Sequence, residues 1–332
     1  KFIYHLKKEL PLLDEDHILG FDEIEVSQKD AKCQLAEKWF EKTVTDSELQ
    51  VSEDDTQIHI KGREFAYTID RRTALFTEMK FAGREYLNHP MELNIWRAPT
   101  DNDMYIKSEW KKAHYDKAYT RAYTTEVVQG KHGVKITSHA SVVAETVQKI
   151  LDVTITWKIE AAGKIDADIA VTKDDEFPDL PRFGVRMFLD KKLSAARYFG
   201  MGPQESYCDK HQAASHGLYH ANVDDLHEDY IRPQENGSHY DCEYVELNNS
   251  RYGIVVSAEN AFSFNASYYT QEELEKKTHN YELTESDSVV FCVDYALNGI
   301  GSNSCGPVVL DQYRFDDVLF RFQFTLIPYV KG

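Results

Sequence analysis

The feature that most constrains the fold is an alternation of apolar and polar side chains with a period of two. Between residues 319 and 327, Phe320, Phe322, Phe324 and Leu326 occupy alternate positions, and Arg, Gln and Thr residues stand between them. Successive side chains of a β-strand point to opposite faces of its sheet. The pattern therefore predicts a strand with one face in a core.

Similar alternation recurs along the chain. Residues 150–157 and 165–171 repeat it, and Ala161-Ala162-Gly163-Lys164 between them predicts a hairpin. Further strands are predicted at Ile58–Ile60, Phe65–Ile69, Phe183–Leu189, Phe262–Tyr268 and Val289–Tyr295.

Helical signals are few and short. Thr270 with Glu273 three residues later has the spacing of a capping box, which predicts one or two helical turns. Residues Lys107 to Lys117 predict another short helix. Strands and helices do not alternate regularly, which argues against a parallel, doubly wound sheet. We therefore predict a mostly β fold, one large antiparallel sandwich with few short helices.

A polar cluster at residues 45–55 marks the best candidate for a domain boundary. The residues before it carry too few alternating strands to close a sandwich alone, and folds of that size usually need staples. We predict that residues 1–45 are the tail of a preceding domain plus a linker, and that residues 46–332 form one domain.

Composition limits the partners and says little about the compartment. A formal net charge of −18 disfavours nucleic acid and anionic membranes, because a phosphate surface would repel the chain. Five cysteines without Cys-x-x-Cys spacing favour neither a disulfide framework nor a zinc site. No apolar stretch reaches the roughly 18 residues of a membrane span. The chain begins with Lys1 rather than Met, so a signal upstream would not be visible.

The first motif is Trp96-Arg97-Ala98-Pro99-Thr100-Asp101-Asn102-Asp103. Pro99 fixes a turn, and the three short polar side chains after Thr100 bond to nearby backbone amides. Two alternatives remain open from these residues alone. The segment is either a structural turn or surface cation site, or part of a ligand-binding loop.

The second motif has two halves, Gly202-Pro203-Gln204-Glu205-Ser206-Tyr207 and Arg232-Pro233-Gln234-Glu235-Asn236-Gly237. Glu205 can be a general acid only if a second carboxylate flanks the same bond. Sequence proximity offers four candidates for that partner, Asp209, Glu235, Asp241 and Glu243. The favoured alternative is a structural Glu205 that bonds backbone amides and holds loops.

The third motif runs from Asp294 to Pro307 and is rich in Gly, Ser and Asn. It predicts a flexible polar loop after a strand, where ligands often bind. No helix follows it, so it is not a dinucleotide fingerprint. His211, His216, His220 and His227 hint at a metal cluster by spacing, but no His-Glu-x-x-His accompanies them, and we favour ordinary hydrogen-bonding histidines.

The three motifs, in this order, resemble the C-terminal part (domain 5, small-chain type) of the large bacterial β-galactosidases of glycoside hydrolase family 2. The resemblance covers roughly residues 50 to 332. It implies a galactose mutarotase-like supersandwich for residues 46–332, and the tail of an immunoglobulin-like domain plus a linker for residues 1–45. It also implies that the catalytic glutamates lie elsewhere, in a barrel that this chain lacks.

The resemblance further implies roles for single residues. Loops 101–113 and 299–307 would border the substrate pocket of the intact enzyme, which hydrolyses terminal β-D-galactosides with retention. The residues implied at this substrate rim are Asp101, Asn102, Asp103, Tyr105, Asn303 and Cys305. Those implied to maintain the structure are Trp96, Arg97, Pro99, Gly202, Pro203, Glu205, Glu235, Asn236 and Gly237.

The sequence departs from the family pattern at two positions. Met104-Tyr105 stands where the family often has a glycine hinge, and Cys305 stands where some members have a Trp that stacks on the sugar. The resemblance implies no cofactor in this piece, a sodium ion held by carbonyls near Arg232 and Pro233, and Mg and Na in the intact enzyme. Its implied partners are the rest of the β-galactosidase chain, a galactoside and further copies of the chain in a homo-oligomer.

Three alternatives stand beside a C-terminal domain. The chain can be the small subunit of a two-chain β-galactosidase. It can be a free-standing mutarotase-like enzyme, which needs a His and a Glu that converge on a sugar. It can also be a non-catalytic sugar-binding module, which needs exposed aromatic side chains in a groove.

Overall fold

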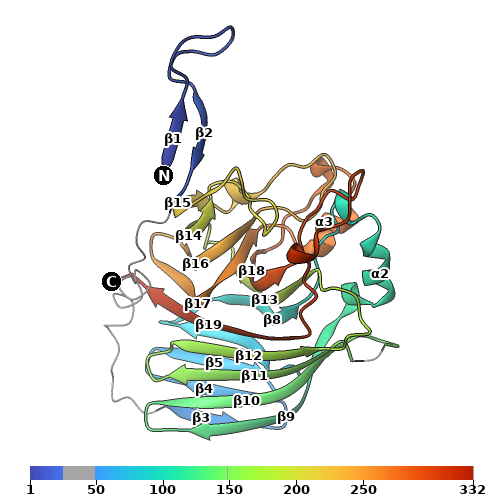
Figure 1. Ribbon diagram of the computed structural model, residues 1–332. Coiled ribbons are helices and arrows are strands. Elements are labelled where there is room, and N and C mark those ends of the chain that lie inside the picture. The colour runs from blue at the N-terminus through green and yellow to red at the C-terminus, as the bar shows by residue number, and fades with distance from the viewer. Residues whose placement is uncertain (25–48, 148, 332) are drawn as a thin grey trace. The chain divides into compact units, whose positions relative to one another are not determined.

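A computed structural model describes residues 1–24, 49–147 and 149–331 (Figure 1). The chain divides into two compact units between residues 42 and 43. The predicted border between residues 45 and 46 lies outside the described residues. In the first unit, β1 (Phe2–His5) pairs antiparallel with β2 (Ile18–Asp22). The Tyr4 hydroxyl donates to Asp22 Oδ2 at 2.6 Å across this hairpin.

The described part of the second unit is built mainly from strands. They are β3 (Gln50–Glu53), β4 (Gln57–Lys61), β5 (Phe65–Asp70), β6 (Leu75–Phe81), β7 (Arg84–Glu85), β8 (Leu87–Asn94), β9 (Tyr119–Gln129), β10 (Gly133–Val143), β11 (Leu151–Glu160), β12 (Ile165–Lys173), β13 (Arg182–Asp190), β14 (Ala195–Gly202), β15 (Ser215–Asn222), β16 (Ser238–Asn248), β17 (Tyr252–Ser267), β18 (Ser288–Leu297) and β19 (Leu319–Val330).

The helices described in this unit are short. They are α2 (Ile106–Lys112), α3 (Gln271–Lys276) and the 3-10 turns η1 (Asp101–Asp103), η2 (Tyr115–Lys117), η3 (Asp224–Leu226), η4 (Asn280–Glu282) and η5 (Asp311–Tyr313). None of the helices in the described part of the chain is long and apolar enough to cross a membrane.

Two antiparallel sheets organise the described residues of this unit. A 12-stranded sheet has the path β15-β14-β16-β17-β19-β12-β11-β10-β9, and β13, β18 and β8 branch from it. A five-stranded sheet has the order β3-β4-β5-β6-β7. Both sheets are antiparallel throughout the described pairings. The predicted mostly β, antiparallel fold with few short helices is confirmed.

β19 lies in the middle of the large sheet, between β12 and β17. Its phenylalanines at 320, 322 and 324 and Leu326 are all buried, whereas Arg321 and Gln323 are exposed. The predicted core face of this strand is therefore confirmed. β19 joins the half of the sheet that ends at β9 to the half that ends at β15.

The two sheets meet through aromatic side chains. The Trp157 ring of β11 packs edge-on against Phe76 of β6, with centroids 4.9 Å apart. Trp157 Nε1 donates to Ala74 O at 2.8 Å, and the Tyr67 hydroxyl donates to Gly163 O at 2.7 Å. Each of these buried polar tips thus has a partner on the facing layer, which is the usual condition for burying Trp and Tyr.

The helix predictions are confirmed with two differences. Thr270 accepts from the Glu273 amide at 3.1 Å and starts α3. The Glu273 carboxylate, however, accepts from the Thr284 amide and so does not complete the capping box. The segment predicted from Lys107 to Lys117 is interrupted, because His114 adopts a left-handed backbone (φ 58) between α2 and η2.

Candidate functional site

The three sequence motifs meet at one place in the second unit. The Asp101 amide donates to Gln234 Oε1 at 2.9 Å, and the Glu235 amide donates to Ala98 O at 2.9 Å. The Gly237 amide donates to Glu205 Oε2 at 2.8 Å. The segment after β8 and both halves of the second motif are therefore joined by hydrogen bonds that backbone amides donate, two of them to side-chain oxygens and one to a backbone carbonyl.

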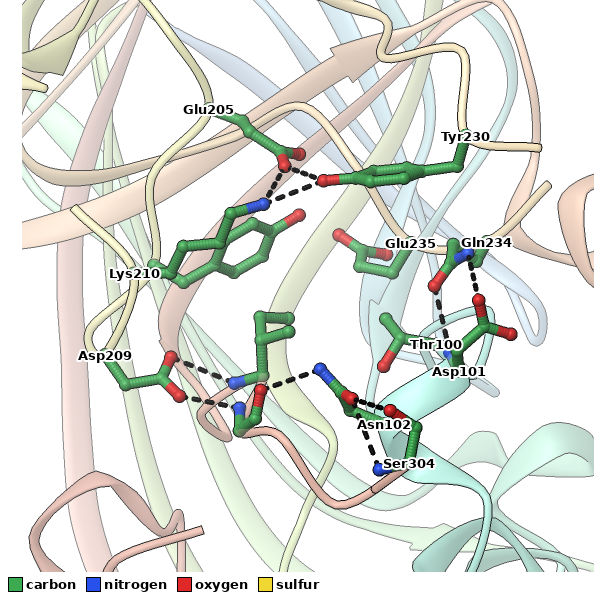
Figure 2. A pocket seen from close by; sticks show the side chains of 13 residues that line it. Thr100, Asp101, Asn102, Glu205, Asp209, Lys210, Tyr230, Gln234, Glu235 and Ser304 are labelled. Carbon is green, nitrogen blue, oxygen red and sulfur yellow. Dashed lines mark hydrogen bonds and ion pairs between the residues drawn. The ribbon is translucent and has the colours of Figure 1, made fainter. Parts of the chain in front are cut away.

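The loop after β18 is bonded to the same group of segments. Asp209 accepts from the amides of Ile300 at 2.9 Å and Gly301 at 2.7 Å. Asn102 donates to Gly301 O at 2.7 Å, and its Oδ1 accepts from the Ser304 hydroxyl at 2.8 Å. Loops 101–113 and 299–307 are thus tied to each other through Asn102, as Figure 2 shows.

These segments surround a polar cavity of about 490 Å³, within the range of small-molecule sites. Its lining residues are Thr100, Asp101, Asn102, Glu205, Tyr207, Asp209, Lys210, Tyr230, Gln234, Glu235, Ile300, Gly301 and Ser304. Four of them are carboxylates and one is a lysine, so the lining attracts cations and repels anions.

A buried ion pair joins residues next to the lining in sequence. Arg97 donates to both oxygens of Asp103, at 3.1 and 2.7 Å, and neither side chain is exposed by more than 3%. The Arg97 guanidinium also donates to the carbonyls of Asn298 at 2.5 Å and Gly299 at 3.1 Å, and lies over the Trp110 ring. Asp103 therefore anchors Arg97 and does not line the cavity.

A second buried arginine is shared by two carboxylates. Arg182 binds both oxygens of Asp294, at 3.1 and 2.5 Å, and donates to Glu235 Oε2 at 3.1 Å. All three side chains are almost fully buried. Burial raises the pKa of Glu235, and the attraction of Arg182 and Arg97 opposes this shift without cancelling it.

Glu205 is fully engaged in holding its neighbours. Its Oε1 accepts from the Lys210 ammonium and the Tyr230 hydroxyl, and its Oε2 accepts from the Gly237 amide. Figure 2 shows the three side chains Glu205, Lys210 and Tyr230 joined at the upper edge of the cavity. This geometry favours the structural alternative for Glu205 over a general acid.

One oxygen of the lining, Glu235 Oε1, is buried and has no hydrogen-bond partner. Buried polar atoms are normally paired, because each unpaired group costs about 1–3 kcal/mol. Thr100 Oγ1 faces the Asp103 amide in the capping box of η1, and Tyr207 Oη faces the Ser238 backbone. Each of these two hydroxyl oxygens can still take a further hydrogen bond, so all three atoms can contact a group that enters the cavity.

The residues implied at the substrate rim are placed differently from one another. Asp101 and Asn102 line the cavity, whereas Asp103 is buried against Arg97 and is outside the lining. Tyr105 is 61% exposed, Cys305 is exposed and Asn303 is half-buried, and these three are outside the cavity lining.

The residues implied to be structural mostly lie in the interior. Buried ones are Trp96, Arg97, Gly202, Glu235, Asn236 and Gly237, while Pro99 is half-buried and Pro203 is exposed. Of the carboxylates suggested as partners of Glu205, Asp209 and Glu235 line the same cavity, and Asp241 and Glu243 do not.

Sequence reasoning missed Lys210, Tyr230 and Arg182. Lys210 and Tyr230 left no signal, since single polar residues in loops are common. Arg182 and Asp294 did leave one. Each stands at the end of a strongly apolar stretch, where a charged residue is buried only if it is paired.

The interpretation of the histidines as ordinary hydrogen-bonding residues and the sodium position near Arg232 and Pro233 stay predictions. Among residues 1–24, 49–147 and 149–331, no group of three or more His, Cys, Asp or Glu is placed to hold a metal ion. The carbonyl of Arg232 accepts from Gln234 Nε2 at 3.0 Å. A carbonyl oxygen has a second lone pair, so this contact does not decide whether a sodium ion binds near Arg232 and Pro233, and no step depends on such an ion.

Comparison with known proteins gives the family. Residues 61–326 match the family described as Beta galactosidase small chain. The β-galactosidase of Actinobacillus pleuropneumoniae is 43% identical over 324 residues, which is 98% of this chain and 31% of that protein. The β-galactosidase of Staphylococcus xylosus is 32% identical over 324 residues, 97% of this chain and 32% of that protein.

Solved structures resemble the chain only distantly. Galactose 1-epimerase from Lactobacillus acidophilus NCFM covers 86% of this chain and 99% of its own, with a TM-score of 0.47 and 8% identity. The structure titled HI1317 covers 87% of this chain and 98% of its own, with a TM-score of 0.41 and 9% identity. Likeness at this level says nothing of ligand or activity.

Two antiparallel sheets, with three motif loops gathered around one acidic cavity, define a large antiparallel β domain. The chain belongs to the β-galactosidase small-chain family. The family resemblance expected from the three motifs is confirmed. The chain spans about a third of the length of the relatives that it matches.

Proposed function

We propose that this chain acts as a non-catalytic part of a β-galactosidase, whose other two thirds break the glycosidic bond. The observation that carries the proposal is the share of each protein that the alignment with a relative covers. Almost the whole chain, 98%, aligns with a protein named β-galactosidase, yet it accounts for only 31% of that protein. The substrate would be a terminal β-D-galactoside, hydrolysed with retention.

The carboxylates of the cavity support a non-catalytic role. Glycosidic cleavage usually needs two carboxyl groups that flank the bond, one of them able to deliver a proton. Here Glu205 is bonded through both oxygens, and Asp209 caps two backbone amides. Glu235 keeps one oxygen without a partner, but its other oxygen is bound to Arg182. Of these three carboxylates, only Glu235 keeps an oxygen without a partner. The fourth carboxylate of the lining, Asp101, is exposed, and its Oδ2 accepts from Gln234 Nε2 at 3.4 Å.

In this proposal the two loops tied by Asn102 form a wall of the substrate pocket in the intact enzyme. Asp101, Asn102 and Ser304 face the cavity, and the exposed Tyr105 and Cys305 extend the same loops outward. Such loops act by positioning, and a small displacement of a positioning element can cost about 10²-fold in rate.

The test compares the chain alone with the complete enzyme. The purified 332-residue chain should not hydrolyse a nitrophenyl β-galactoside. In the complete enzyme, Asn102→Ala should lower kcat/KM about ten-fold by releasing the two loops from each other. The control Thr124→Ala, at an exposed position of β9 outside the cavity lining, should change it little. Turnover by the chain alone that disappears in Glu205→Gln would contradict the proposal.

A second candidate is the small subunit of a two-chain β-galactosidase. The description of the matched family as a small chain favours it. Separate expression tells the two apart. A small subunit should bind a separately produced partner and restore hydrolysis, whereas a domain of one continuous chain should stay inactive when mixed with the remainder.

A further inference from the structure

The buried charges around the cavity do not balance. Two guanidinium groups, Arg97 and Arg182, face three carboxylates, Asp103, Asp294 and Glu235, and all five residues are at most 4% exposed. Arg97 is bound to Asp103, while Arg182 is divided between Asp294 and Glu235. When all five groups are ionised, two positive charges face three negative ones, so one buried carboxylate has no full counter-charge.

The lining of the cavity adds to this excess. Asp101, Glu205 and Asp209 carry negative charge, and the single cation among the lining residues is Lys210. Lys210 is already bonded to Glu205, and it lies 5.4 Å from the centroid of the Tyr230 ring. The cavity therefore attracts a further cation and disfavours an anionic ligand.

The uncompensated charge has an open position for a partner. Glu235 Oε1 has no hydrogen bond, although the side chain is only 3% exposed. Figure 2 shows the Glu235 carboxylate pointing into the cavity, on the side that faces Lys210. Thr100 and Tyr207 line the same space, and their hydroxyl oxygens keep capacity for a further hydrogen bond beside the backbone groups of Asp103 and Ser238 that they face. All three oxygens can accept hydrogen bonds.

A guanidinium group fits this arrangement better than a metal ion or an ammonium group. It donates through five N–H groups in one plane, is weakly hydrated and can bind a carboxylate and hydroxyl oxygens together. No cluster of metal-ligand side chains occurs in the described parts of the chain, and a space of about 490 Å³ exceeds that of one ion. A compact ammonium reaches three separate oxygens less well than a fork of donors does.

We propose that this cavity receives an arginine side chain from the part of the β-galactosidase that this chain lacks, with Glu235, Tyr207 and Thr100 as its acceptors. The origin of the arginine rests on the proposed function. The preference of the cavity for a guanidinium does not, because it follows from charges and acceptors within this chain. Docking of the two parts would then neutralise the buried carboxylate.

The test uses three small probes on the 332-residue chain at pH 7 and fixed ionic strength. They are N-acetyl-arginine methylamide, the lysine analogue and the citrulline analogue, which has nearly the shape of arginine without its charge. Titration calorimetry should show the arginine probe binding at least ten-fold more tightly than either of the others. Glu235→Gln should weaken its binding at least ten-fold, and Tyr207→Phe by a smaller factor.

Glu228→Gln is the matched control, since Glu228 lines a neighbouring cavity and not this one. It should leave the affinity unchanged. Affinity for the arginine probe should also rise with pH, because the guanidinium binds the ionised form of Glu235, which faces Arg182, Arg97, Asp294 and Glu205. Wild-type protein alone gives this readout if Glu235→Gln fails to fold.

Several results would overturn the proposal. The first is equal affinity for the arginine and citrulline probes, and the second is unchanged affinity for the arginine probe in Glu235→Gln. The third is stabilisation of the chain by sodium or magnesium that is lost in Glu235→Gln. The fourth is binding of galactose that is lost in the same variant. Failure of the probes leaves the proposed function standing, because hydrolysis by the complete enzyme is measured separately. Conversely, the chain could bind the arginine probe and yet fail to form an active enzyme with the remaining two thirds of a β-galactosidase. That result would support the guanidinium site and contradict the proposed function.

Discussion

Arg97 and Asp103 are six residues apart and form a buried two-point ion pair, with N···O distances of 3.1 and 2.7 Å. The same guanidinium holds the carbonyls of Asn298 and Gly299, about two hundred residues later in the chain. One side chain thus fixes the start of the first motif against the start of the third. Both segments continue into residues that line the cavity, Thr100 to Asn102 on one side and Ile300 and Gly301 on the other.

Removing the charge of Asp103 should therefore destabilise the domain strongly. Asp103→Asn leaves Arg97 buried without its counter-charge, and breaking one side of a buried pair typically costs about 3–5 kcal/mol. Urea unfolding followed by tryptophan fluorescence measures this change. The control is Asp101→Asn, whose carboxylate is exposed and should stay within about 0.5 kcal/mol of wild type. Equal effects of the two variants would refute a special role for the buried pair.

Asp209 should control the order of the loop at residues 299–307. Its two oxygens accept from the amides of Ile300 and Gly301, so Asp209→Ala leaves both amides without their acceptors. We expect faster hydrogen exchange at these amides and a loss of about 1–3 kcal/mol in the free energy of unfolding. Hydrogen-exchange mass spectrometry of peptides from this loop measures the exchange rates. Asn303→Ala is the control and should leave these rates unchanged. Unchanged exchange in Asp209→Ala would show that other contacts hold the loop.

His239 should make the domain less stable as the pH falls. Burial lowers its pKa to about 4, despite the hydrogen bond that its Nδ1 donates to Met201 O. The unfolded chain binds this proton near pH 6.5, so stability is present above that pH and is lost as the pH falls toward about 4. The contribution is on the order of 3 kcal/mol.

His239→Phe isolates this effect, because a phenyl ring can keep the packing against Phe264, 5.0 Å away between centroids, and against Tyr198. The free energy of unfolding, measured between pH 7 and pH 4, should decrease less steeply in the variant than in the wild type. His220→Gln, at an exposed position, should retain the wild-type slope. An identical slope in His239→Phe would show that other groups set the acid sensitivity.

Cys305 should be the first thiol to react among the four cysteines that the structure describes. It is exposed, whereas Cys242 and Cys292 are buried and Cys208 is half-buried. Burial raises the pKa of Cys208 to about 11 and that of Cys292 to about 12, so their reactive thiolates are scarce at neutral pH.

A chromogenic disulfide measures this in a Cys33→Ser background, since Cys33 lies outside the described residues. One fast equivalent should react, and it should vanish in Cys305→Ser. Fast labelling that persists in that variant would show that another of these cysteines opens to solvent.

The strands were predictable where only one face is buried. β11, β12 and β19 alternate visibly, and their apolar positions are the ones that the structure buries. The first half of β17 was missed because Gly253, Ile254, Val255 and Val256 are buried on both faces and show no alternation. β9 was missed for the opposite reason, since most of its residues are exposed at the edge of the sheet.

The motifs were predictable as unusual segments, but the cavity was not. Its lining is assembled from residues 100 to 304, and no local pattern records which loops meet. Asp103 illustrates the limit. Its neighbours Asp101 and Asn102 face the cavity, but it turns inward to Arg97, and a row of three short polar residues does not reveal which one does so.

The place of β19 at the centre of the large sheet also bears on how the domain is made. The ribosome produces β12 and β17 well before β19, yet β19 is the strand that pairs with both. Until residues 319–330 leave the ribosome, the edges of β12 and β17 that pair with β19 in the folded domain have no partner strand. Translation therefore exposes this protein to edge-to-edge association late in synthesis, when chaperones would matter most.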